Sequence, residues 1–190
     1  MQYAIAYALS SAAGLRAIFA LAVASLAVHA GWFHPPANLA WLDAWPVTIA
    51  LLVLAALELL ADKVPLLDHS LHVAQTVLKP AIAAILVAGA LHGLPAPALV
   101  SLVVLGALNA LGIHAAAASG RGVSTTFTGG FGNPIVSLFE DMAALAISVL
   151  AFLTPWLAAI LALVVGAIAV RVLVGVRRTL FAKARANVGD

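Results

Sequence analysis

The sequence predicts an all-helical polytopic membrane protein with about six transmembrane spans, and its composition supports this in two ways. Apolar residues make up 65% of the 190-residue chain and charged residues only 8%. The mean hydropathy is +1.16. Soluble domains carry about 25% charged residues, so the lipid bilayer is expected to surround most of the chain.

The same composition excludes several classes of function. The chain has no cysteine, which excludes disulfides, thiol catalysis and cysteine-ligated metals. A net charge of +2 is too small to indicate a nucleic-acid partner. A cleavable signal peptide is not expected, because no basic segment precedes the first apolar run and Arg16 interrupts it. No motif indicates an enzyme or a cofactor.

The first predicted span runs from about Tyr3 to about Ala30 and carries Arg16 near its middle. A central arginine costs roughly 2.5–3.5 kcal/mol on an insertion scale, and each Leu, Ile, Phe or Val returns about 0.3–0.6 kcal/mol. The span holds nine such residues, so insertion is close to balanced. Arg16 should therefore face protein or water. The small residues at 10–14 should allow close helix packing or a local break beside it.

The second and third predicted spans flank a more polar stretch. A loop over 32–45, rich in tryptophan and proline, should lie at the membrane interface, and a span over about 46–61 follows it with proline in its first turn. Residues 66–78 are too polar to span, and their apolar stripe predicts a short amphipathic or re-entrant helix. The third span should begin at the next proline and cover about 80–94.

Three further spans complete the expected fold. The fourth covers about 97–118, and the Gly/Ser/Thr-rich stretch 119–133 predicts a flexible loop or a re-entrant lining segment. An Asn-Pro pair looks like the N-cap and first residue of a fifth span over about 133–154. The sixth span begins with the proline at 155 and leads into a basic cytoplasmic tail over 179–190.

The distribution of basic residues predicts the orientation. Six spans place both termini on one side, and every basic residue except Arg16 falls on that side. These residues are Lys63, Lys79, Arg121, Arg171, Arg177, Arg178, Lys183 and Arg185. Because cytoplasmic loops are enriched in Lys and Arg, both termini are expected in the cytoplasm and the protein in the bacterial inner membrane.

A short internal repeat suggests how the single membrane domain is organised. The heptads at 80–86 and 155–161 agree at five of seven positions. Two inverted halves, 1–94 and 95–178, would follow, as in many transporters. Alanine- and leucine-rich segments also match by chance, so the repeat is a hypothesis.

Ionisable residues inside apolar spans are the first candidates for a functional site. Glu58 and Asp62 are spaced to share one helix face. The predicted ion- or substrate-binding set is Arg16, Glu58, Asp62, His114, Glu140 and Asp141. Its carboxylates would bind a cation or a proton, while Arg16 pairs with one of them or binds an anion. The structural alternative is that Arg16 only neutralises the carboxylates, as buried ions normally require.

A metal site is a second, weaker hypothesis. Asp68, His69 and His72 have the spacing of ligands on one helix face. The alternative is a solvated face. His114 likewise has the alternative of a hydrogen-bonded packing residue.

Four short motifs in fixed order resemble a known family. They are Ala-Gly-Leu-Arg-Ala at 13–17, Glu-Leu-Leu-Ala-Asp-Lys-Val-Pro-Leu-Leu-Asp at 58–68, Gln-Thr-Val-Leu-Lys-Pro at 75–80 and Leu-Phe-Glu-Asp at 138–141. Their order and spacing resemble the bacterial membrane family of domain of unknown function 4126 over nearly the whole chain. The resemblance implies a small multi-pass membrane protein with these polar positions as its hallmark, and it implies no activity. The basic segment expected after the fourth span is absent, since His114 is followed by alanines.

Three functions follow from these features. The main expectation is a secondary transporter for a small ion or solute that uses the intramembrane carboxylates. The first alternative is a non-transporting scaffold or assembly protein, because the many small residues also suit a homo-oligomer interface. The second is a lipid-handling, flippase-like protein in which Arg16, Lys79 and Arg121 contact a phosphate head group.

Overall fold

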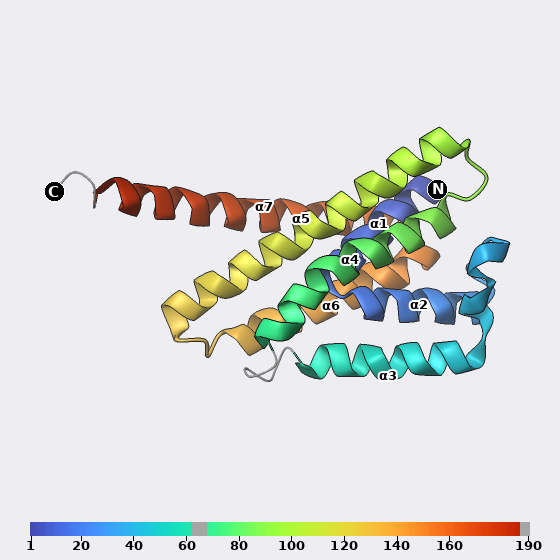
Figure 1. Ribbon diagram of the computed structural model, residues 1–190, viewed down its shortest axis with the longest axis horizontal. Helices are drawn as coiled ribbons and strands as arrows, with labels where there is room; N and C mark the ends of the chain where they lie inside the picture. Colours follow the sequence, from blue (N-terminus) through green and yellow to red (C-terminus); the bar gives the residue numbers. More distant parts are fainter. Residues whose placement is uncertain (62–67, 187–190) are drawn as a thin grey trace.

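The computed structural model describes residues 1–61 and 68–186, and all regular structure within these ranges is helical. Seven α-helices and one 3₁₀-helix follow one another along the chain. They are α1 (Gln2–Leu15), α2 (Ala17–His29), η1 (Ala37–Asp43), α3 (Trp45–Ala61), α4 (Asp68–Ala90), α5 (Ala96–Thr128), α6 (Asn133–Leu153) and α7 (Pro155–Ala186). The predicted all-helical class is therefore confirmed (Figure 1).

The first apolar run is broken at Arg16, whose backbone is extended (φ −137°, ψ 95°). α1 and α2 meet at this residue and both lead from the centre of the bundle towards the same end (Figure 1). Packing against α4 agrees with this. Ala6 of α1 clusters with Leu91 just beyond α4. Beyond α2, Phe33 and Leu39 lie close to Gly89 of α4. A Cβ added at Gly89 would lie 3.2 Å from Phe33 and 3.0 Å from Leu39.

α1 and α2 therefore form a helical hairpin. At 1.5 Å per residue, their 14 and 13 residues reach only about 20 Å, which is short of the roughly 30 Å hydrocarbon core. The prediction of one continuous span over 3–30 is wrong, whereas the alternative of a local break beside Arg16 is confirmed. α1 packs against α4, α5, α6 and α7 in the interior of the bundle.

Close packing of α1 depends on small residues. A Cβ on Gly14 would lie 2.7 Å from the backbone oxygen of Ala110 in α5, so only glycine fits there without a shift. One turn earlier, the Asn109 amide donates to the hydroxyls of Ser10 and Ser11 at 2.9 Å each. These contacts bind the first half of the hairpin to α5.

The hairpin changes the position of the amino terminus. The start of α1 and the described end of α7 lie at opposite ends of the structure (Figure 1). The prediction that both termini are cytoplasmic assumed a continuous first span, and it stays a prediction.

α4 is one continuous helix with Pro80 inside it. The prediction of a separate surface helix over 66–78 followed by a span starting at Pro80 is wrong in this respect. A proline has no N–H for the carbonyl four residues earlier, here that of Thr76, and membrane helices tolerate this where neighbouring groups help to satisfy the carbonyl. The two matching heptads of the suggested repeat thus occupy different positions, since Pro80 is internal and Pro155 begins α7.

α5 continues through most of the segment predicted to be a loop. Its 33 residues end only at Gly129, which adopts a left-handed conformation (φ 61°). The hydroxyls in its last three turns donate to the carbonyl four residues earlier, as in Thr125 to Arg121 and Thr126 to Gly122, both at 2.9 Å. These hydroxyls find their partners within the helix, so the polar residues do not end it. The prediction of a loop over 119–133 is therefore wrong for residues 119–128, which are helical.

The last two helices follow the predictions closely. α6 ends at Leu153 with Thr154 as its C-cap, and α7 begins at Pro155. At the start of α6 the N-cap is Gly132 rather than Asn133, so the prediction was one residue late.

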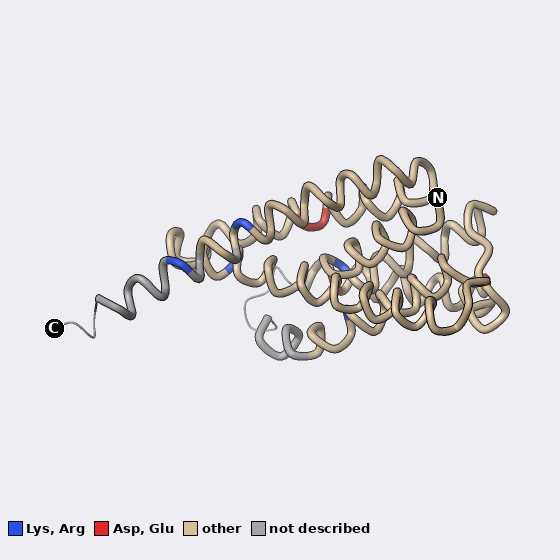
Figure 2. Tube along the Cα trace, turned by 90° about the horizontal axis from the view of Figure 1, so that it is seen from above, with Lys and Arg blue, Asp and Glu red and all other residues tan. Residues whose placement is uncertain are grey.

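Apolar side chains cover much of the outside. Three described helices, α5, α6 and α7, are long and apolar enough to cross a membrane, and a fourth span results if η1 and α3, bent by 71°, are one unit. Six spans are not confirmed. Charged positions are gathered around the middle of the described trace and along α7 (Figure 2). Helices that are apolar outside and polar inside indicate a membrane protein.

Candidate functional site

Glu58 of α3 binds the broken end of the hairpin. Its two carboxylate oxygens accept the backbone N–H groups of Ala17 and Phe19, each at 3.0 Å. These are among the first N–H groups of α2, which have no partner within their own helix. Glu58 is only 7% exposed, so a buried carboxylate caps α2 from another helix and complements its dipole.

Arg16, at the break itself, points its charge towards α6. Its side chain is fully buried, and Nε donates to Asp141 Oδ1 at 2.6 Å while a terminal nitrogen donates to Ser137 Oγ at 2.8 Å. The same terminal nitrogen lies 3.9 Å from Glu140 Oε2. Ser137, Glu140 and Asp141 are one turn apart on α6, so one helix face presents three acceptors to one guanidinium.

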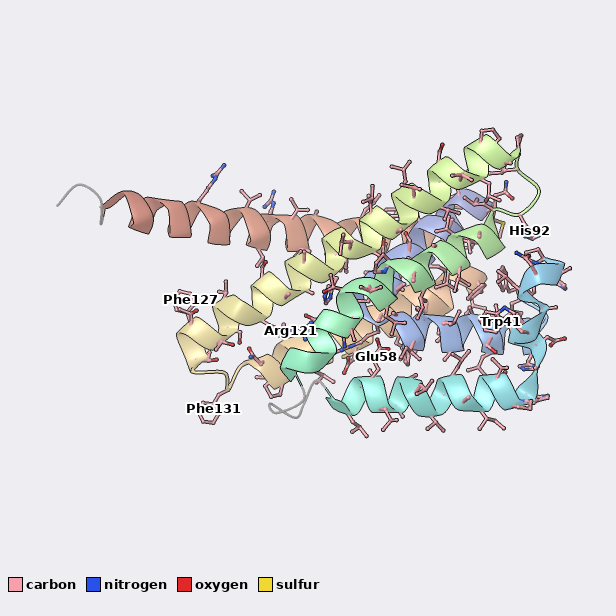
Figure 3. The ribbon with its side chains drawn as sticks, in the orientation of Figure 1. Trp41, Glu58, His92, Arg121, Phe127 and Phe131 are labelled. Atoms are coloured by element: carbon pink, nitrogen blue, oxygen red, sulfur yellow. The ribbon has the colours of Figure 1, made fainter. Side chains whose placement is uncertain are left out.

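A second guanidinium reaches the same carboxylate from α5. Arg121 lies 3.6 Å from Glu140 Oε2, and it occupies this position because α5 remains helical through residues 119–128. Figure 3 shows Glu58 and Arg121 between the two ends of the bundle, with Trp41 and His92 at one end and Phe127 and Phe131 at the other.

Lys79 and His114 extend the cluster between α4 and α5. Lys79 is fully buried and its Nζ lies 3.0 Å from His114 Nδ1. The other ring nitrogen of His114 lies 3.5 Å from the Thr76 hydroxyl. Glu58, Glu140, Arg16 and Arg121 all interact electrostatically with the Lys79 ammonium.

Together these residues form a charge cluster in the centre of the bundle. It contains three basic side chains and three acidic ones, namely Arg16, Lys79, Arg121, Glu58, Glu140 and Asp141. The charges balance when all six are ionised. Buried charges are stable in a low-dielectric interior only when they are compensated in this way.

The structure brings together most of the predicted site. Arg16, Glu58, Glu140 and Asp141 belong to the charge cluster, and His114 joins it through Lys79. Asp62 lies outside the described residues. The backbone of the suggested metal ligands Asp68, His69 and His72 belongs to α4, but their side chains lie outside the described part. Within the described part, no group of three or more His, Asp or Glu side chains could hold a metal ion.

Two cluster residues, Lys79 and Arg121, and the Arg16 partner Ser137 were not in the predicted set. Ser137 could have been found, because it lies on the same helical face as Glu140 and Asp141. Lys79 was assigned to the interface because Pro80 was taken as a helix start. Arg121 was assigned to a loop because the Gly/Ser/Thr-rich stretch 119–133 was taken as the end of a helix. Continuous helices move both side chains into the bundle.

A separate polar network fastens the outer ends of α2 and α3. His29 Nε2 lies 2.8 Å from Thr48 Oγ1, and its Nδ1 lies 3.5 Å from Asp43. This is the order of an acid–histidine–hydroxyl triad. The Thr48 side chain is fully buried and its hydroxyl also bonds Ser25, so the network links α2 to α3 inside the bundle.

Several cavities open along the bundle. One of about 620 Å³ is lined by apolar side chains of α2, α3 and α6. One of about 380 Å³ lies among α5, α6, α7 and the end of α1, and Glu140 is the charged residue among its described lining. One of about 300 Å³ lies along the outer half of α1, where Tyr3, Tyr7, Ser10 and Asn109 contribute polar groups.

The fold and the charge cluster define a class of protein, a helical membrane protein whose polar groups are gathered around a helical hairpin. The chain belongs to the family described as Domain of unknown function (DUF4126), whose model matches residues 3–174. This confirms the resemblance found in the four sequence motifs. No curated protein and no solved structure matches the chain.

Proposed function

We propose that this protein is a secondary transporter or channel for a small ion or solute, with the charge cluster as its binding site. The observation that supports this most strongly is the end of the hairpin at Arg16, in the middle of the bundle and surrounded by ionisable groups. Transporters commonly build their ion and substrate sites from helices interrupted at this depth. Non-helical backbone is otherwise avoided inside a membrane.

The charge balance of the cluster suits a site that exchanges partners. Binding a cation at Glu140 or Asp141 requires Arg16 to move away, since its guanidinium now occupies both carboxylates. Arg16 adjoins the hairpin break, so this movement acts directly on α1 and α2. The arrangement thus corresponds to a closed state in which internal ion pairs take the place of the transported species.

The proposed topology differs from six spans. We propose that α3 to α7 cross the membrane and that the hairpin enters from the side of the amino terminus. All four tryptophans lie at that end, in exposed positions typical of the interface. The loops there contain no Lys or Arg, whereas exposed Arg171 and Arg178 lie towards the other end on α7. By the positive-inside rule, the carboxyl terminus is cytoplasmic and the amino terminus is outside, in a bacterial inner membrane.

A lipid-handling protein is the second candidate, and the 380 Å³ cavity favours it. This cavity joins an apolar wall from α5, α6 and α7 to Glu140, beside Arg16 and Arg121. An acyl chain fits the apolar wall, and a phosphate head group suits the two guanidinium groups. Neither candidate function needs a cofactor, a nucleic acid or a catalysed reaction.

Ion flux in proteoliposomes tests the proposal. The purified protein is reconstituted, and fluxes of Na⁺, K⁺, Ca²⁺, chloride and phosphate are measured with and without a pH gradient. Asp141→Asn and Glu140→Gln remove cluster charges, and Asp43→Asn removes a matched carboxylate that is 67% exposed and outside the cluster. A flux that is lost in the two cluster variants and kept in Asp43→Asn supports a transporter.

Two other outcomes assign the protein differently. Scrambling of a fluorescent phospholipid, sensitive to Arg121→Gln and without ion flux, supports lipid handling. Absence of both activities, with cluster variants that are only less stable, makes the ion pairs structural. The protein is then a scaffold whose exposed apolar helices bind other membrane proteins or a second copy.

A further inference from the structure

The Lys79–His114 pair is the most deeply buried titratable contact in the described part of the chain. The two residues are 0% and 2% exposed, and their nitrogens are 3.0 Å apart. An ammonium and an imidazole that serve only for packing are costly in a membrane, because each must remain hydrogen-bonded. A pair of proton-binding groups in direct contact can also pass a proton.

We propose that Lys79, His114 and Thr76 form a proton relay that connects Glu58 to the surface of α4, which makes the proton the coupling ion. This rests on the proposed transport function and adds the identity of the coupling ion. Lys79 and Glu58 belong to the charge cluster, whereas His114 and Thr76 lie beside it and are added by this inference.

The geometry fixes how the proton moves. An ammonium only donates, so with Lys79 charged the Nδ1 of His114 accepts and Nε2 carries the ring proton, facing the Thr76 hydroxyl at 3.5 Å. When Nζ gives its proton to Nδ1, the ring releases the proton on Nε2 towards the Thr76 hydroxyl. The ring must return to the Nε2–H form, which leaves Nδ1 free to accept again, before the neutral amine of Lys79 takes a proton from the Glu58 side. The same steps in reverse deliver a proton to Glu58. One proton enters and one leaves, and no covalent bond between heavy atoms changes.

The two ends of the relay lie in different surroundings. Thr76 is exposed on α4, one turn from the buried Lys79. At the other end, Glu58 attracts the Lys79 ammonium and accepts the N–H groups of Ala17 and Phe19. The relay thus leads from an exposed position to the residue that binds the hairpin.

Proton occupancy at Glu58 acts on the hairpin. Hydrogen bonds to an ionised acceptor are about twice as strong as neutral ones, so protonating Glu58 weakens both bonds to α2. The other charged groups around Lys79 are Arg16, Arg121 and Glu140, and Arg16 lies at the hairpin break. Delivery of a proton therefore loosens the hairpin next to the transport site, which couples proton movement to opening.

The protonation state of His114 provides a direct test. Protein with ¹⁵N-labelled histidine is placed in lipid nanodiscs, and His114→Gln identifies its signals among the six histidines. A relay predicts that the two ring nitrogens exchange character within roughly pH 5–8, the range where histidine normally titrates, and that Glu58→Gln shifts this change. A fixed Nε2–H tautomer at every pH, unaffected by Glu58→Gln, overturns the relay.

Flux measurements separate this inference from the transport proposal. Where wild type carries ions, His114→Gln and Thr76→Val are expected to reduce the pH-gradient-driven part about 100-fold, since positioned proton-transfer groups contribute at least that much. His92→Gln, at an exposed histidine near the other end (Figure 3), is the control. Ion flux with no pH dependence, together with a fixed His114 tautomer, supports the transporter and contradicts the relay. A His114 tautomer that changes with pH, without ion flux, supports the relay and contradicts the transporter.

Lys79→Met is the variant most at risk of misfolding, because it leaves the cluster with one uncompensated negative charge. Thr76→Val alters only an exposed side chain and is expected to fold. If Thr76→Val folds and leaves proton movement unchanged in rate, Thr76 is not the exit of the relay and the route as proposed is wrong.

Discussion

Replacing Glu58 tests whether the hairpin depends on a carboxylate from α3. In the structure, this carboxylate accepts two backbone N–H groups of α2 at 3.0 Å, and the side chain is 7% exposed. The N-cap residue of α2, Arg16, makes no side-chain capping bond itself. Glu58→Ala therefore leaves two backbone donors at the start of the helix without this acceptor.

The expected loss of stability follows from these two bonds. A hydrogen bond to a charged group contributes about 1.5–3 kcal/mol, so Glu58→Ala should lower the free energy of unfolding by about 3–6 kcal/mol. Glu58→Gln keeps one carbonyl oxygen and turns an amide N–H towards the other donor. It should lose about half as much, near 1.5–3 kcal/mol. Both losses are large against a typical total stability of about 5–15 kcal/mol.

Equilibrium unfolding in mixed micelles, followed by circular dichroism, measures these differences. Asp43→Asn is the matched control, because Asp43 is 67% exposed and its 3.5 Å contact with His29 is a surface pair, which contributes about 0–1 kcal/mol. If Glu58→Gln is as stable as Asp43→Asn, then Glu58 does not hold the hairpin and the structural role assigned here is refuted. A loss in Glu58→Ala equal to that in Glu58→Gln would show that the negative charge, which both variants remove, matters rather than the number of acceptors.

Three further predictions concern the hairpin. Gly14→Ala puts a Cβ 2.7 Å from a backbone oxygen of α5, so it should lower the free energy of unfolding by about 1–3 kcal/mol. The control is Gly112→Ala, whose Cβ would meet no atom within 4 Å and which should be neutral or stabilising in the same assay. Because the chain has no cysteine, Gln2→Cys and Arg178→Cys each introduce a single thiol that reports on which side of the membrane it lies. In intact cells a membrane-impermeant thiol reagent should label Gln2→Cys and not Arg178→Cys. If neither variant is labelled until the cells are opened, both ends are cytoplasmic, as a continuous first span requires. Arg16→Lys keeps the charge but cannot bond Asp141 and Ser137 together through a planar fork, so it should cost about 1–3 kcal/mol; unchanged stability on denaturation would mean that the guanidinium geometry is unimportant.

Local sequence signals correctly predicted several elements. Pro155 begins α7, and the turn residue Thr154 ends α6. Low charge and high hydropathy predicted the membrane environment. Most of the predicted site is also present, because an ionisable side chain in an apolar helix has to turn inwards to find a partner whatever the fold is.

The errors share a cause. Proline and Ser/Thr/Gly-rich segments usually interrupt helices, but Pro80 lies inside α4 and residues 119–128 continue α5. In a membrane the alternative to a helix is unsatisfied backbone, so the bilayer favours a continuous helix over local propensity. This moved Lys79 and Arg121 from predicted interface and loop positions into the charge cluster.

The sequence by itself determined that the chain is helical, lies in a membrane and carries compensating charges at buried positions. Those properties follow from composition and from the cost of a lone charge in lipid. Only the tertiary structure decided that the chain turns back at Arg16, that Glu58 caps α2, and that Lys79 meets His114. These depend on contacts between residues 35 to 125 positions apart, and a linear pattern does not specify which helix face meets which.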